Sequence, residues 1–255
     1  MSQYKKKEAL IFITAAGKGT RMGELTKSYP KALLNLNGRP LVSYLCSYLT
    51  SKPASKEVVI TYAKHTDKWM SFSKKYAAIQ FKDYTQNPSI IFTLFNTAAY
   101  SDADNIIIIN ADTVFDFNLI DSTLLQHKSL GNDITVVLNK NNAHSMKRWE
   151  YKFNRNRDDL VDIVDGKTTT SIEKYFFIVK REVLKDFTNN FTLNMGLSEQ
   201  DIYHKFRYFG KGCTCILKSL LSVGKYNMKA VFSQNYLFNI NTPETLVEAE
   251  TFFSQ

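Results

Sequence analysis

Apolar runs and turn-forming residues alternate along the first half of the chain in the rhythm of strands followed by helices. Strands are expected over residues 9–15, 58–62 and 79–84, and helices over residues 40–49, 65–75 and 91–99. The most apolar run, four isoleucines at residues 106–109, suits a strand covered on both faces, as in the middle of a parallel sheet. These features predict an open, doubly wound α/β fold with a mixed, mainly parallel sheet.

The second half has a different pattern, with shorter apolar segments separated by turns such as residues 165–166. It predicts strands over residues 133–138, 149–153, 160–164 and 175–179, and helices over residues 181–187, 201–208 and 243–253. Thr242 is expected to cap the last helix, with Pro243 in its first turn. We interpret the extra strands as antiparallel, added to the same sheet or forming a lobe beside it. Because no repeat or linker marks a boundary, residues 1–255 are expected to form a single domain.

Composition indicates a protein that folds around its own hydrophobic core. The chain has 255 residues, of which 44% are hydrophobic and 13% aromatic, so folding requires neither disulfides nor a metal. Cys213 and Cys215 are too close in sequence for an ordinary disulfide, and with Cys46 the number of cysteines is odd. No segment has the pattern of a membrane span or a signal peptide. We therefore expect a cytoplasmic protein that has no membrane partner.

The positive charge is concentrated in the first third of the chain. Residues 1–75 carry 14 Lys and Arg against 4 Asp and Glu, whereas the rest carries 19 against 20, within a total net charge of +9. Such a potential steers anionic ligands. Nucleic acid is not the expected partner, because the basic residues are scattered singly among apolar ones and no zinc-finger spacing or aromatic-rich RNA-binding signature is present.

The stretch at residues 14–40 follows the first predicted strand, which is where open α/β sheets bind ligands. It matches neither the dinucleotide-binding fingerprint, whose third glycine is replaced by Met22, nor the Walker A motif. Its chemistry still suits phosphate binding, because glycines let backbone amides approach an anion and basic side chains supply charge. The residues concerned are Gly17, Gly19, Lys18, Arg21 and Lys31. A glycine turn with a basic surface is the alternative at this point.

The same stretch resembles the signature GxGTRM, followed by PK, of the nucleotidyltransferases with the glycosyltransferase A type fold, which include the sugar-1-phosphate nucleotidyltransferases. The matching residues are Gly17, Gly19, Thr20, Arg21, Met22, Pro30 and Lys31, continued by the run at residues 33–41. The resemblance implies a Rossmann-like nucleotidyltransferase fold. It also implies transfer of a nucleoside monophosphate from a nucleoside triphosphate to a sugar 1-phosphate, with release of pyrophosphate.

Two later segments resemble the metal-binding elements of the family. IIIINADTVF is similar to the strand whose final aspartate holds the catalytic magnesium, and Asp112 is the matching residue. Asp112 as a helix or turn cap is the alternative. FNINTPETLVEAE is similar to the family's closing element, in which an acidic residue is often the second metal ligand. Here that place is taken by Asn239 or Asn241, so the Mg²⁺ site would have one negative charge fewer.

The resemblance implies an in-line displacement at the α-phosphorus that requires no protein nucleophile. Arg21 is expected to bind the β and γ phosphates, and Lys31 the α-phosphate and the acceptor phosphate. The backbone at Ala15, Ala16 and Gly17 is expected to face the base and ribose, and Lys18, Gly19 and Thr20 to complete the nucleotide site. Candidate acceptor-binding residues are Trp149, Tyr151, Glu199 and Asp201.

The sequence says less about the acceptor substrate and the nucleotide base than about the phosphate-binding residues. The segments that contact the sugar in the family have no clear equivalent in this chain. Glu173 and Lys174 lack the following proline, and residues 87–99 lack a Gly-Thr-Ala turn and resemble the corresponding helix of phosphocholine cytidylyltransferases. Three alternatives stay open: a cytidylyltransferase for phosphocholine or another non-sugar phosphate, a molybdenum cofactor guanylyltransferase, and a nucleotide-binding regulator without turnover. The expected partners are an NTP and a small phosphorylated acceptor, and homodimer formation is left open.

Overall fold

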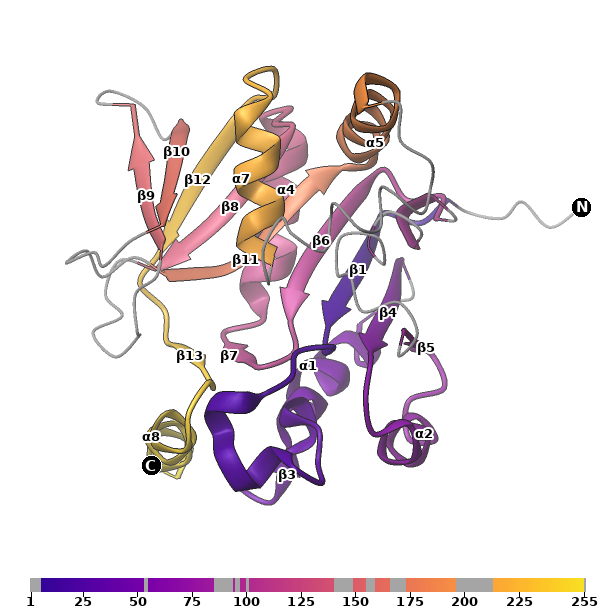
Figure 1. The fold of residues 1–255 in the computed structure, drawn as a ribbon, viewed down its shortest axis with the longest axis vertical. Coiled ribbons are helices and arrows are strands. Elements are labelled where there is room, and N and C mark those ends of the chain that lie inside the picture. The colour runs from indigo at the N-terminus through magenta and orange to yellow at the C-terminus, as the bar shows by residue number, and fades with distance from the viewer. Residues whose placement is uncertain are drawn as a thin grey trace, which may run out of the picture.

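A computed structural model of the protein shows a seven-stranded sheet with helices on both faces (Figure 1). The structure describes residues 6–52, 55–84, 94, 97–99, 101–139, 149–154, 159–165, 173–195 and 213–254. The strand order in the sheet is β12-β8-β11-β6-β1-β4-β5. The strands are β1 (Ala9–Thr14), β4 (Lys56–Tyr62), β5 (Gln80–Asp83), β6 (Asn105–Asn110), β8 (Ile134–Asn139), β11 (Glu173–Lys180) and β12 (Met228–Ser233).

The sheet is mainly parallel, as the sequence predicts. β1 pairs in parallel with both β4 and β6, with Ile11 opposite Val58 on one side and Ile107 on the other. β11 is the antiparallel exception, because it runs opposite to both β6 and β8. The carboxyl ends of β1, β4 and β6 therefore meet at one edge of the sheet, where a ligand site is expected in this fold class.

Two hydrophobic layers cover the sheet. Helices α1 (Leu41–Thr50), α2 (Thr66–Ser73) and α4 (Asn118–Ser129) pack on one face, where Ile107 and Ile109 contribute to the core. Helices α5 (Arg181–Met195) and α7 (Cys213–Ser222) pack on the other face, with Ile106 and Ile108 (Figure 1). Successive side chains of a strand point to opposite faces, so the four isoleucines serve both layers.

The antiparallel strands of the second half occur in both of the expected arrangements, one within the main sheet and the other beside it. β11 lies inside the main sheet, whereas β9 (Trp149–Phe153) and β10 (Leu160–Asp165) form a hairpin of their own. The hairpin contacts the edge strand β12 through a bridge between Asp159 and Lys229, whose side chains also form an ion pair. The last helix, α8 (Pro243–Phe253), is capped by Thr242, whose side chain accepts a hydrogen bond from the Thr245 amide as expected.

Several elements differ from the expectation. Helix α5 continues to Met195 instead of ending at residue 187, and neither α7 nor β12 is predicted from the sequence pattern. After Asp112 the chain forms a short strand, β7 (Thr113–Phe115), and α4 begins only at Asn118, so Asp112 is not a helix cap. The predicted helix at residues 201–208, the turn after residue 165 and most of the helix at residues 91–99 lie outside the described residues.

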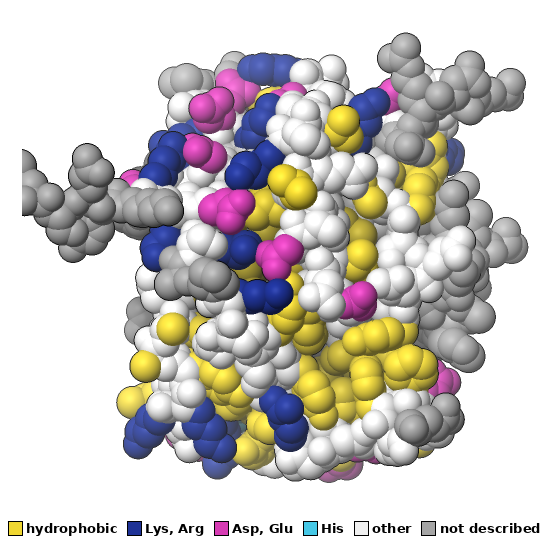
Figure 2. All heavy atoms as spheres, turned by 180° about the vertical axis from the view of Figure 1, so that it is seen from behind, with side chains coloured by type: hydrophobic (Ala, Val, Ile, Leu, Met, Phe, Trp, Pro, Cys, Tyr) yellow, Lys and Arg dark blue, Asp and Glu magenta, His cyan; other side chains and the backbone are white. Residues whose placement is uncertain are grey.

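The two ends of the sheet have different surfaces. Figure 2 shows the face covered by α1 and α4, with charges of both signs in its upper part and hydrophobic side chains gathered lower down. At the amino ends of the strands, Glu8 and Asp121 pair with lysines such as Lys56 and Lys128. Near α8, Val247 and Phe252 are exposed.

Among the described residues, no helix has the length and apolar character that crossing a membrane requires.

His127, in the last turn of α4, is expected to make folding sensitive to mild acid. The side chain is buried and its Nδ1 lies 2.8 Å from Thr135 Oγ1, while Nε2 has no hydrogen-bond partner among the described residues. Burial, followed by the charge of Lys180, lowers the pKa of His127 to about 4 from its ordinary value of 6.5. The unfolded chain therefore binds the proton more readily, so stability is full above pH 6.5 and falls as the pH drops toward 4.

We expect the free energy of unfolding to fall by about 2 kcal/mol between pH 7 and pH 5, measured by urea denaturation. His127→Gln removes the titrating group and is expected to flatten the curve in that window. Asp121 and Asp133 have lowered pKa values, so their contributions are lost only at more acidic pH. An equally steep loss in the His127→Gln variant would contradict the assignment.

Candidate active site

The glycine-rich loop after β1 is held in shape by two local features. Gly19 adopts φ 65°, a left-handed conformation that disfavours residues with a Cβ. Its carbonyl accepts hydrogen bonds from Thr26 Oγ1 at 2.9 Å and from the Met22 amide at 2.8 Å. The Met22 side chain is buried in a small cluster with residues that include Val114 and Ile240. The loop is therefore anchored to the β6–β7 segment and to the C-terminal segment.

Gly19→Ala is expected to destabilise the protein by about 1–2 kcal/mol, because an L-residue is strained in the left-handed region. A Cβ at this position would also lie 3.0 Å from Thr26 Cγ2. Gly17→Ala is the matched control in the same loop, since a Cβ there meets nothing within 4 Å. Chemical denaturation measures both variants. Equal stability of the two would show that the conformation at residue 19 is not required.

The backbone joins three segments that are far apart in sequence. The Ala111 amide donates to the Thr14 carbonyl at 3.0 Å, which places the end of β6 beside the start of the loop. The Ile240 amide donates to the Asp112 carbonyl at 2.9 Å, and β13 (Leu237–Asn239) pairs with β7 with Asn239 opposite Thr113. Asp112 is thus placed between the loop and the C-terminal segment.

The side chains of these segments form one polar cluster around Lys31. The Lys31 ammonium forms an ion pair with Asp112 Oδ2 and donates to Asn241 Oδ1 at 2.9 Å. Arg21 Nη2 donates to the same Asn241 oxygen at 2.7 Å, and Asn241 Nδ2 donates to Asn239 Oδ1 at 2.6 Å. The side chains of Lys31 and Asp112 are only 13% and 19% exposed, so their charges act with reduced screening.

The donor set of this cluster fits Mg²⁺. Asp112 Oδ1 is buried and has no hydrogen-bond partner among the described residues, so this oxygen is available as a ligand for a cation. Magnesium is commonly held by one or two carboxylates together with phosphate oxygens of the substrate. Asn239 and Asn241 add carboxamide groups. Within the described ranges no group of three His, Cys, Asp or Glu side chains forms an all-protein metal site.

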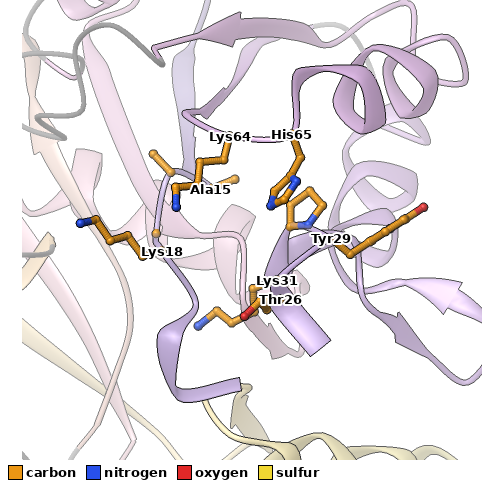
Figure 3. A pocket seen from close by; sticks show the side chains of 10 residues that line it. Ala15, Lys18, Thr26, Tyr29, Lys31, Lys64 and His65 are labelled. Atoms are coloured by element: carbon orange, nitrogen blue, oxygen red, sulfur yellow. The ribbon is translucent and has the colours of Figure 1, made fainter. Parts of the chain in front are cut away.

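A pocket adjoins the cluster on the side of β4 (Figure 3). It holds about 270 Å³ of empty space, part of it open solvent. Predicted nucleotide-binding residues form one wall, and the turn between β4 and α2 forms the other with Lys64 and His65. The complete lining is Ala15, Ala16, Gly17, Lys18, Thr26, Tyr29, Pro30, Lys31, Lys64 and His65.

The remaining predicted site residues are distributed differently. Gly19 and Thr20 do not line the pocket, and Arg21 instead joins the cluster through Asn241. Tyr151 is 6% exposed and packs in the core on the face covered by α5 and α7, so the structure gives its ring a packing role. Trp149 lies in β9, but its side chain is outside the described part of the chain, as are residues 199 and 201.

The mixed, mainly parallel α/β sheet, with a glycine-rich basic loop beside a strand-ending aspartate, has the arrangement that the sequence resemblance implies for a nucleotidyltransferase. A family model confirms this class, because residues 11–190 match the MobA-like NTP transferase domain. The protein belongs to this family.

Curated relatives match parts of the chain. A 2-aminoethylphosphonate cytidylyltransferase from Lancefieldella rimae is 33% identical over 86 residues, which are 33% of this chain and 33% of the relative. A UTP–glucose-1-phosphate uridylyltransferase from Haloferax volcanii is 26% identical over 111 residues, covering 43% of this chain and 45% of the relative. The chain thus spans less than half the length of each of these relatives.

Solved structures match over nearly the whole chain and show the fold. HddC from Yersinia pseudotuberculosis superimposes with a TM-score of 0.70 and 18% identity, covering 96% of this chain and 99% of that one. The CTP:phosphocholine cytidylyltransferase of Streptococcus pneumoniae has a TM-score of 0.67 and 16% identity, with the same coverage. The Rossmann-like nucleotidyltransferase architecture implied by the sequence resemblance is therefore confirmed.

Proposed function

We propose that the protein transfers a nucleoside monophosphate from an NTP to the phosphate of a sugar 1-phosphate and releases pyrophosphate. The observation that carries this proposal is the cluster of Lys31, Asp112, Asn241 and Arg21 at the carboxyl edge of the sheet. It combines two cations for phosphate oxygens with an acidic group for a metal, next to a pocket lined by the glycine-rich loop.

The reaction in this site is an in-line displacement. An oxygen of the acceptor phosphate attacks the α-phosphorus, a new P–O bond forms, and the bond from the α-phosphorus to the bridging oxygen breaks, so that pyrophosphate leaves. Lys31 binds the α-phosphate and the incoming acceptor phosphate, and Arg21 binds the β and γ phosphates. Asn241 holds both cations in position, since its Oδ1 accepts from each of them. Fixed positive charge at these oxygens stabilises the transition state.

The same cluster suits a magnesium-dependent reaction. Asp112 and either Asn239 or Asn241 would hold Mg²⁺, with Asp112 Oδ1 as the oxygen available to it. The bound ion would supply neutralisation of charge on the bridging phosphate oxygens. In the free protein, the Lys31 ammonium neutralises part of the negative charge of Asp112, because it pairs with the other oxygen of that carboxylate.

A second candidate is cytidylyl transfer to a phosphonate or to phosphocholine. The 33% identity to a 2-aminoethylphosphonate cytidylyltransferase favours it, and a phosphonate oxygen attacks an α-phosphorus in the same manner as a phosphate oxygen. The nucleotide-side residues would keep their roles, and only the acceptor contacts would differ.

The test is pyrophosphate release with Mg²⁺ across a matrix of GTP, CTP, UTP, dTTP and ATP against sugar 1-phosphates, phosphocholine and 2-aminoethylphosphonate. Mass spectrometry identifies the product of each active pair. Turnover with a sugar 1-phosphate supports the first proposal, whereas turnover confined to phosphocholine or the phosphonate replaces it with the second. NTP binding without turnover for any pair would favour a regulator over an enzyme.

A further inference from the structure

The pocket wall formed by the β4–α2 turn is not explained by the phosphate chemistry. Lys64 is exposed and His65 half-buried, and neither side chain forms a hydrogen bond or ion pair with another described residue. Figure 3 shows both side chains extending from this turn toward the loop that carries Ala15 and Lys31. This differs from the amino edge of the sheet, where lysines such as Lys56 and Lys128 pair with acidic residues.

The backbone of the β4–α2 turn has an uncommon conformation at His65. His65 has φ 56° and ψ 47°, a left-handed conformation that is uncommon for a residue with a side chain. Such strain is retained where the surrounding structure requires it, and it clusters at ligand sites. Here the turn joins the end of β4 to the first residue of α2 and places two consecutive basic side chains on the pocket.

The position along the sheet edge indicates which part of a nucleotide this wall meets. β4 and β6 flank β1, so the turn after β4 and Asp112 after β6 are separated by two inter-strand spacings, about 10 Å. The cluster around Asp112 and Lys31 takes the phosphates in the proposed function. A ligand that continues past the loop toward β4 therefore presents its ribose and base to Lys64 and His65.

The geometry points to Lys64 as a residue that selects the nucleotide base, with His65 beside it; this inference rests on the proposed function. A lysine ammonium only donates hydrogen bonds. It favours a base with a carbonyl oxygen, such as O6 of guanine, O4 of uracil or thymine, or O2 of cytosine, over adenine, whose only acceptors are ring nitrogens and whose exocyclic amine is a donor. The preferred substrates are thus NTPs with a carbonyl-bearing base, and ATP is disfavoured.

The experiment compares NTP affinities by calorimetry for the wild type, Lys64→Met and Lys74→Met, with inorganic tripolyphosphate as a base-free probe. Lys74 is the matched control, since it is exposed, follows α2 and does not line the pocket. In the wild type we expect one carbonyl-bearing NTP to bind at least about ten-fold more tightly than ATP. Lys64→Met is expected to remove most of that preference, a loss of about ten-fold, because a charged donor is lost. Tripolyphosphate binding is expected to match that of Lys74→Met.

Three results would overturn the inference while leaving the proposed function intact. They are ATP as the preferred ligand, unchanged base preference in Lys64→Met, and an equal weakening of tripolyphosphate, which would make Lys64 a phosphate ligand. If the wild type binds none of the NTPs, the proposed function fails together with this inference.

Discussion

Asp112→Asn is expected to lower kcat about a thousand-fold, with the substitution keeping the shape of the side chain. The carboxylate is the acidic group of the cluster, and its Oδ1 is the buried oxygen with no partner among the described residues. Loss of an electrostatic contribution of about 4 kcal/mol in the transition state corresponds to this factor. Steady-state kinetics in a magnesium titration measures the effect, and the concentration of Mg²⁺ required for half-maximal rate should rise.

The matched control is Asp116→Asn, which makes the same chemical change just after the far end of β7. Asp116 accepts a hydrogen bond from Asn235 Nδ2 at 2.8 Å and another from the Asn118 amide at 3.1 Å, so its contacts are structural. We expect Asp116→Asn to keep kcat within a few fold of the wild type, after correction for folded protein. Comparable losses in both variants, or an unchanged magnesium requirement in Asp112→Asn, would contradict the metal role.

Lys31→Met is expected to lower kcat/KM by a factor on the order of 10²–10³, the usual effect of removing one preorganised donor from a developing anion. Unlike Asp112→Asn, it is also expected to weaken NTP binding measured without metal, because a cation is lost next to the phosphates. Lys31 is only 13% exposed, so its charge is not replaced readily by solvent.

Lys27→Met serves as the control for this variant. Lys27 lies in the same loop, is 71% exposed and pairs with Glu24 at the surface, so its removal should change kcat/KM little. The double variant Lys31→Met/Asp112→Asn is expected to lose less than the product of the single losses, since the two groups pair directly. Fully multiplicative losses, or an unaltered NTP affinity in Lys31→Met, would show that the two residues act at separate sites.

The central sheet could be predicted from the sequence because its signals are local. The isoleucines of β6, the strand before the glycine loop and the Thr242 cap each depend on residues adjacent in sequence. Helix α7 and strand β12 were not predicted. Their hydrophobic patterns are short, and their positions depend on packing against strands that are distant in sequence. Tertiary contacts decide such elements more than intrinsic propensity does.

The site was predictable to a similar extent. The resemblance pointed to Arg21, Lys31 and Asp112, and the structure places all three in one cluster. Their roles remain predictions. Lys64 and His65 belong to no motif, and they reach the pocket only because β4 pairs with β1 in a register that brings their turn beside Ala15. Without the pairing of β4 with β1, two basic residues in a turn look the same as ordinary solvated surface charge.

The spacing of residues in the sequence does not decide which of Asn239 and Asn241 takes the place of the second metal ligand. Both Asn239 and Asn241 match the place of the second metal ligand, and the sequence does not separate them. In the structure Asn241 accepts hydrogen bonds from Arg21 and Lys31, while its amide donates to Asn239 Oδ1. Asn241 therefore organises the cations, and a metal would compete with them for its oxygen.

Nucleotidyl transfer is tested by following the α-phosphorus of the NTP. With isotopic label at that atom, Mg²⁺ and an active acceptor, we expect label in a nucleoside diphosphate-linked product and unlabelled pyrophosphate, with no product when the acceptor is omitted. Transfer of the γ-phosphate to the acceptor, or release of labelled nucleoside monophosphate without an acceptor, would contradict nucleotidyl transfer.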